Sequence, residues 1–125
     1  MRPVTRKAFL RLVRRAYAEV PDFFRERLVN LEISVRSLPG PEAGRWRGSR
    51  ALLGLYSGLT RQQMCETDPG AHLPARIYLY QVNIESGSGT PKAVLEQVRT
   101  TLRHELAHHF GFSEKDLRRV WPEGA

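Results

Sequence analysis

Two histidines and a glutamate lie close together near the C-terminal end of the sequence. Residues 104–108 read HELAH, the H-E-x-x-H pattern, with the histidines four positions apart. On an α-helix, residues i and i+4 share one face, one turn apart, so His104 and His108 can reach the same ion. Zinc binds neutral imidazole nitrogens in a tetrahedral site and keeps one position for water when three protein ligands bind. The pattern therefore predicts a zinc site.

The glutamate of this motif is placed to act as a base. Glu105 directly follows the first histidine and is offset from it by about 100° around a helix. Its side chain would then reach a metal-bound water rather than the metal itself. A carboxylate in this position can remove a proton from the water, whose pKa zinc lowers toward about 7. We expect Glu105 to be the catalytic base of a hydrolase.

A third protein ligand is expected after the motif. The string continues as H-E-x-x-H-x-x-G-x-x-E, with Gly111 followed three residues later by Glu114. It resembles the metzincin string, in which a histidine at that last position swings back to the metal. A carboxylate is an acceptable zinc ligand, which makes Glu114 the leading candidate, although an acid there also suits the first turn of a helix. Other residues with suitable chemistry are Asp116, His72 and Glu85.

The motif is expected on a long helix with recognisable ends. Thr90 and Pro91 suit an N-cap and a first helical position, and Gly111 suits a left-handed C-cap. We therefore predict a helix from Pro91 to Phe110.

A helical wheel divides this helix into an apolar arc and a polar side. His104 and His108 fall just beyond one edge of the arc, and Glu105 falls inside it. His109 lies in the middle of the arc, so we expect a hydrogen-bonded core histidine there rather than a ligand. The apolar arc consists of Val94, Leu95, Val98, Leu102 and Leu106. A metal would then bind at the margin of the core.

The rest of the chain is expected to complete an α+β fold. Residues Thr5–Val20 carry apolar side chains at helical spacing, with arginines on the other side. Apolar patterns predict strands at Leu31–Arg36, Ala51–Tyr56 and Arg76–Ile84. Short helical segments are expected at Pro21–Leu28 and Glu114–Val120, and loops at Leu38–Gly48 and Ser57–Pro74. The prediction is a small mixed sheet of about three strands, packed with the N-terminal helix and the motif helix.

The composition is that of a soluble globular protein. The chain has 125 residues, 41% of them hydrophobic and 26% charged, and we expect a single domain over residues 1–125. No apolar run approaches the ~18 residues that cross a bilayer. The N-terminus lacks the apolar core of a secretory signal, and the single cysteine, Cys65, cannot form an intramolecular disulfide. These features favour a cytoplasmic protein without a membrane partner.

Longer segments resemble a known family. The run HELAHHFGFSEKDL, the upstream ALLGLYSG and the segment ARIYLYQ are similar to small bacterial zincin-like metallopeptidases, over much of Ala51–Leu117. The resemblance implies a zinc-dependent peptidase that acts on a peptide or an unfolded protein segment. It also implies His104 and His108 as ligands, Glu105 as the base and an acid at position 114 as the third ligand. The family usually has Asp there, so Glu114 lengthens the reach, and the Met-turn of metzincins is not evident.

The same resemblance suggests where a substrate would bind. In zincins, a strand before the motif helix pairs with an extended substrate, and Arg76–Ile84 would be that strand here. Tyr78 or Tyr80 would then help to stabilise an oxyanion beside the zinc. Aromatic side chains also favour the half-buried surface of a sheet, so an ordinary packing role is the alternative.

Two other classes of function agree with parts of the sequence. The net charge is +7, mostly from scattered arginines, and this suits a nucleic-acid partner as well as a solvated surface. Ligands at His104, His108 and Glu114 resemble the spacing of a bacterial rRNA-maturation endoribonuclease family, which lacks the glutamate after the first histidine. A non-catalytic metal-binding domain is the remaining alternative.

Overall fold

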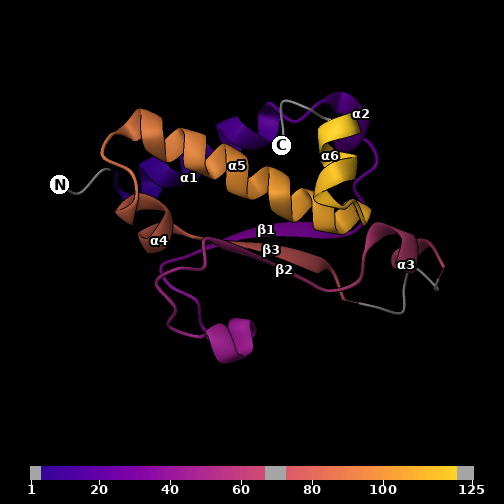
Figure 1. Ribbon diagram of the computed structural model, residues 1–125, viewed down its shortest axis with the longest axis horizontal. Helices are drawn as coiled ribbons and strands as arrows, with labels where there is room; N and C mark the ends of the chain where they lie inside the picture. The colour runs from indigo at the N-terminus through magenta and orange to yellow at the C-terminus, as the bar shows by residue number, and fades with distance from the viewer. Residues whose placement is uncertain (1–3, 67–72, 121–125) are drawn as a thin grey trace.

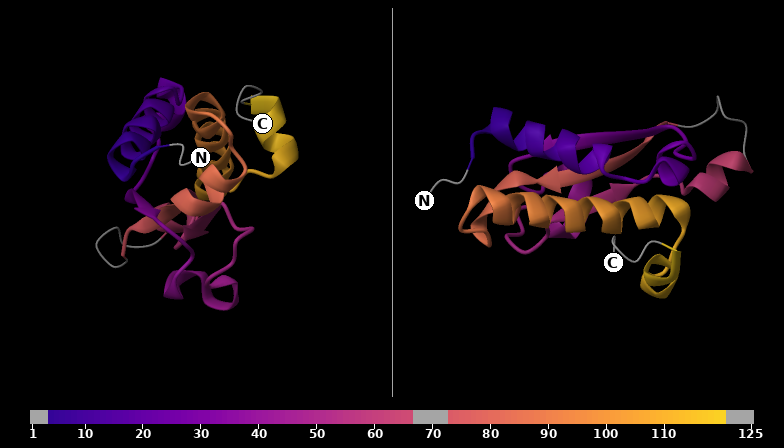
Figure 2. Two further views of the ribbon diagram at one scale, coloured as in Figure 1. Left: turned by 90° about the vertical axis from the view of Figure 1, so that its left-hand side faces the viewer. Right: turned by 90° about the horizontal axis from the view of Figure 1, so that it is seen from above.

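The computed structural model describes residues 4–66 and 73–120, apart from the side chain of Glu114. Two helices lie side by side on one face of a sheet, and the segment between the first two strands lies on the other face (Figures 1 and 2). In chain order the elements are α1 (Arg6–Ala18), α2 (Asp22–Arg25), β1 (Leu31–Arg36), the 3₁₀ helix η1 (Pro41–Trp46), β2 (Gly54–Ser57), α3 (Arg61–Cys65), β3 (Ala75–Tyr80), α4 (Gln81–Ser86), α5 (Pro91–Phe110) and α6 (Glu114–Val120). The expected α+β class is confirmed.

Within the described residues the sheet has three strands in the order β1-β3-β2. β1 pairs with β3 in parallel, with Ile33 opposite Ile77, and β2 pairs with β3 antiparallel, with Tyr56 opposite Ile77. The mixed sheet that the sequence predicts is therefore present. β3 lies in its centre, and β1 and β2 form its two edges.

The side chains of β3 alternate between the two faces of the sheet. Ile77 and Leu79 are fully buried in the core that the sheet shares with α1 and α5. Tyr78 and Tyr80 point to the other face, where their rings stack with centroids 6.4 Å apart. The hydroxyl of Tyr80 donates a hydrogen bond to Glu42 of η1 at 2.8 Å. Both faces of the central strand are thus covered.

The long helix α5 has the predicted boundaries. The Thr90 side chain accepts a hydrogen bond from the Ala93 amide, and Gly111 ends the helix in the left-handed region with φ 73°. α1 begins after the Thr5 cap and packs along α5, and Arg99 of α5 holds Glu19 through two hydrogen bonds of 2.6 and 2.7 Å. No helix in the described part of the chain is long and apolar enough to cross a membrane.

Four segments differ from the expectations. The strand expected over Arg76–Ile84 stops at Tyr80, and α4 follows, because Asn83 donates to the carbonyls of Ser49 and Leu52 and a helical turn buries Ile84. The loop expected over Ser57–Pro74 contains α3, which a Thr60–Gln63 capping box begins. The strand expected from Ala51 begins only at Gly54, and the expected loop Leu38–Gly48 contains η1.

Gly54 allows β2 to approach α5 closely. A Cβ atom at this position would lie 2.7 Å from Thr101 Cγ2 and 3.1 Å from the Tyr78 carbonyl oxygen. The same added atom would be 3.4 Å from Cγ of Glu105. The absence of a side chain at Gly54 therefore sets the distance between the sheet edge and the motif helix.

We predict that Gly54→Ala lowers the free energy of unfolding by about 1–3 kcal/mol, because the new methyl group overpacks against Thr101. Gly87→Ala is the matched control, since a Cβ there meets nothing within 4 Å and its φ is −94°. Its effect should stay within about 0.5 kcal/mol. Urea unfolding followed by circular dichroism measures both. Equal stability of the two variants would contradict the tight contact at Gly54.

Candidate metal centre

The H-E-x-x-H residues occupy the last two turns of α5 and differ in exposure. The side chain of Glu105 is 14% exposed, whereas that of His108 is 66% exposed. His108 Nε2 lies 4.0 Å from Glu105 Oε1. The carboxylate therefore faces the protein while His108 faces outward, as the helical wheel predicts for a site at the edge of the core.

His104 lies between two cavities. One, of about 310 Å³, separates α5 from the segment that enters β2 and also contains Glu105. The other, of about 200 Å³, lies between the end of α5 and the start of α6 and also contains His108. The first is lined by Ala51, Leu52, Leu53, Gly54, Gln97, Thr100, Thr101, His104 and Glu105. The second is lined by His104, Ala107, His108, Phe112, Ser113 and Leu117. Both motif histidines thus line one cavity, and Glu105 lines the neighbouring one.

Burial changes the acidity of the central carboxyl group. Removal from water disfavours the charged form and raises the pKa of Glu105 to about 7. A carboxyl group with such a pKa exchanges a proton readily near neutral pH, which is the property of a general acid–base residue.

The next histidine along the helix has a structural role. His109 is fully buried, its Nε2 accepts a hydrogen bond from the Val29 amide at 3.1 Å, and its Nδ1 is 2.8 Å from the Tyr56 hydroxyl. The Tyr56 hydroxyl itself donates to the Leu59 carbonyl, so Nδ1 carries the proton of a neutral ring. Burial, with the charge of Arg61, lowers the pKa of His109 to about 4. The expectation of a satisfied core histidine is confirmed.

Tyr56 connects this network to the exposed histidine. Its ring stacks on His108 with centroids 6.4 Å apart and an interplanar angle of 20°, while its hydroxyl bonds to His109. Sequence reasoning singled out neither Tyr56 nor Gly54, because their relation to α5 depends on the register of β2 against β3. The sequence signal that could have pointed to them is an aromatic residue, Tyr56, two positions after Gly54 in a short apolar run.

The structure separates the candidates for a third ligand. Glu114 begins α6, directly after Ser113, which lines the cavity of both histidines; the Glu114 side chain and all of His72 lie outside the described residues. Asp116 accepts a hydrogen bond from the Ser113 amide at 3.1 Å as a helix cap, and this bond lowers its pKa. Glu85 accepts from Gln81 on α4, beside the opposite end of α5 (Figure 1). Among the side chains that are described, no three metal-ligating groups form a cluster.

The proposed substrate strand requires a correction. The segment Arg76–Ile84 was expected to offer an edge to a peptide, but β3 is paired with β1 on one side and β2 on the other, so that expectation is wrong. Tyr78 and Tyr80 lie on the face of the sheet away from α5, and the structure does not bring them together with the motif histidines. The strand edge that lies next to the motif belongs to β2.

The residues present fit a zinc ion on chemical grounds. Two histidines one helical turn apart line the same cavity, the residue before Glu114 lines it too, and nitrogen and carboxylate donors suit zinc.

Comparison with known proteins places the chain in a family. A family model described as zincin-like metallopeptidase matches residues 28–122. This match begins further toward the N-terminus than the resemblance that the sequence shows over Ala51–Leu117. No curated protein matches the chain. Because the family match spans the sheet, the motif helix and α6, the chain belongs to the zincin-like metallopeptidase family.

Proposed function

We propose that the protein is a zinc-dependent peptidase that hydrolyses peptide bonds, with Glu105 as its general base. The observation that carries the proposal is the position of Glu105, in a cavity that it shares with His104 and with its pKa raised by burial to about 7. A structural carboxylate would be paired or exposed. Here the carboxyl group is removed from water next to a candidate ligand.

His104, His108 and Glu114 are the residues that would hold the metal. When bound, zinc supplies Lewis acidity toward a carbonyl oxygen and acidifies a water molecule. The stacking of Tyr56 on His108 orients one imidazole, and its hydroxyl fixes the neutral form of the neighbouring His109. The helix end is therefore held in place before a ligand arrives.

Glu105 would move the proton of the reaction. Its carboxylate accepts a proton from the attacking water and passes it to the amine nitrogen that leaves when the peptide bond breaks. The close approach of Gly54 on β2 to Thr101 and Glu105 of α5 limits where the Glu105 side chain can lie. Its burial strengthens the electrostatic interactions of the carboxylate with the reacting groups.

An extended peptide is the substrate that best fits the sheet edge. In the described part of the sheet, β2 is paired only with β3, and the residues that lead into it line the cavity of Glu105. A peptide added alongside β2 would form backbone hydrogen bonds and would pass the cavity at Gly54. This edge takes the place of the β3 edge that the sequence suggested.

The RNA-processing alternative has less support. The charge of +7 suits a phosphate-rich partner, but it says nothing about cleavage. Glu105 is the residue that the endoribonuclease family lacks and the peptidase family has, and here it lines the cavity between α5 and the segment that enters β2. RNA binding that weakens steeply with salt, without any peptide cleavage, would favour the alternative.

We predict that Glu105→Gln lowers kcat by about 10²–10⁴-fold, because the amide cannot accept the proton of water, while zinc binding is retained. The assay is cleavage of a mixture of unstructured peptides by the zinc-loaded protein, followed by mass spectrometry. Glu26→Gln, at an exposed position after α2, is the control that should keep full activity. An active Glu105→Gln variant would remove Glu105 from the mechanism.

The third ligand is tested by zinc affinity rather than activity. Glu114→Ala should weaken zinc binding by at least about tenfold, because a metal ligand is lost, and Asp116→Ala should leave it nearly unchanged. Competition with a fluorescent chelator gives both constants, and circular dichroism checks that α6 remains folded. The reverse order of the two variants would assign the ligand to Asp116.

A further inference from the structure

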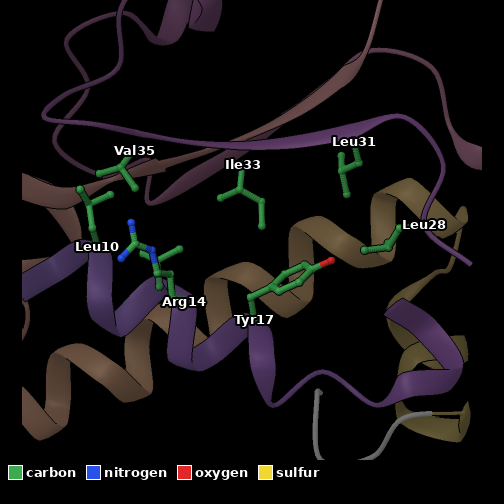
Figure 3. Close-up of a pocket in the computed structure, with 8 residues that line it drawn as sticks. Leu10, Arg14, Tyr17, Leu28, Leu31, Ile33 and Val35 are labelled. Carbon is green, nitrogen blue, oxygen red and sulfur yellow. The ribbon is translucent and has the colours of Figure 1, made fainter. Parts of the chain in front are cut away.

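A groove separates α1 from β1, at the sheet edge opposite the motif (Figure 3). Its volume is about 420 Å³, within the range of roughly 300–1,000 Å³ that is usual for small-molecule sites. The groove exists because α1 packs along α5 rather than over β1 (Figure 2). We call it the α1–β1 groove; its lining residues are Leu10, Val13, Arg14, Tyr17, Leu28, Leu31, Ile33 and Val35.

The walls of the α1–β1 groove are apolar and incompletely covered. Leu31 and Ile33 of β1 face the same side of the sheet as the core residue Val35, but they are only half-buried. Leu10 and Leu28 are half-buried too. Contact of this surface with water is unfavourable, so an apolar occupant would be stabilised by its removal from water.

Arg14 supplies the charge of the groove. Of its lining residues, all within the described chain, Arg14 alone is ionised at neutral pH. Two other arginines of α1 have partners: Arg6 donates to the Val35 carbonyl at 2.8 Å, and Arg15 lies 3.9 Å from Glu19. Across residues 4–66 and 73–120, no described carboxylate pairs with Arg14. Figure 3 shows its guanidinium reaching toward β1 beside Leu10 and Val35.

We propose that the α1–β1 groove binds a medium-chain alkyl carboxylate. The carboxylate pairs with the Arg14 guanidinium, and the chain lies between the Tyr17 ring and β1, toward Leu28 (Figure 3). Leu31 and Val35 are four residues apart on β1, a span of about 13 Å that an extended chain of about ten carbons covers. The single cation of Arg14 beside an apolar surface complements a ligand that has one anionic head group and an apolar chain.

A peptide complements the same lining less well. Each residue of a peptide brings an amide donor and acceptor that must be satisfied when buried. At the β1 edge, the Val35 carbonyl already accepts from Arg6. Apart from the backbone of that edge, the polar groups of the lining are the side chains of Arg14 and Tyr17, which are few for a row of amides. An alkyl chain has no such requirement, and this difference favours the carboxylate.

The test is titration with sodium decanoate below its micelle concentration, followed by calorimetry and by amide NMR shifts. We expect one site, with shifts at β1 and α1, and at least about tenfold weaker binding of decylamine and of hexanoate. Arg14→Gln should weaken decanoate binding about fivefold to tenfold. Arg11→Gln, an exposed arginine of the same helix outside the lining, is the matched control and should bind normally.

Several results would overturn the proposal. These are the absence of decanoate binding, equal binding of decylamine, an Arg14→Gln variant that binds like the wild type, or shifts confined to other surfaces. Association with anionic vesicles without binding of monomeric decanoate would overturn it as well, since it would show a surface attraction instead. The site is independent of the metal centre, so metal-free protein and Glu105→Gln should bind decanoate as the wild type does.

Discussion

The packing of α5 on the sheet is the constraint on which the rest of the structure depends. One helix supplies core residues such as Leu102 and Leu106, which are buried against β3, and it also carries the motif. Gly54 lets β2 come close enough to touch the helix at Thr101 and Glu105. The depth at which each motif residue lies is therefore decided by how closely this helix approaches the sheet.

That depth gives adjacent ionisable side chains different properties. His109 is enclosed and neutral, with its pKa lowered to about 4, and Glu105 is largely enclosed, with its pKa raised to about 7. His108, one residue from the buried histidine, is 66% exposed. Burial disfavours the charged form of a base and of an acid alike, so one cause moves the two pKa values in opposite directions. The adjacent residues His108 and His109 thereby provide a candidate ligand and a structural histidine side by side.

The two edges of the sheet suit different occupants. β2 lies beside the motif helix, next to the cavity of Glu105, whereas β1 lies beside the apolar groove that separates it from α1. β3 separates them, with both of its edges paired and both of its faces covered within the described residues. The proposed peptide substrate would occupy the first edge, where backbone groups and the motif meet. The proposed alkyl carboxylate would occupy the second, where the lining is apolar around one cation.

The sequence by itself determined the local features of this protein. Caps at Thr90 and Gly111 and an apolar arc define α5, and the spacing of His104 and His108 defines the metal-binding pattern, because each depends on neighbours within a few turns. The tertiary structure alone decided which strand is central, the end of β3 at Tyr80, the contact of Gly54 with α5 and the partners of His109. Those features depend on strand register and on packing between distant segments, and apolar strand patterns do not encode which edge stays open.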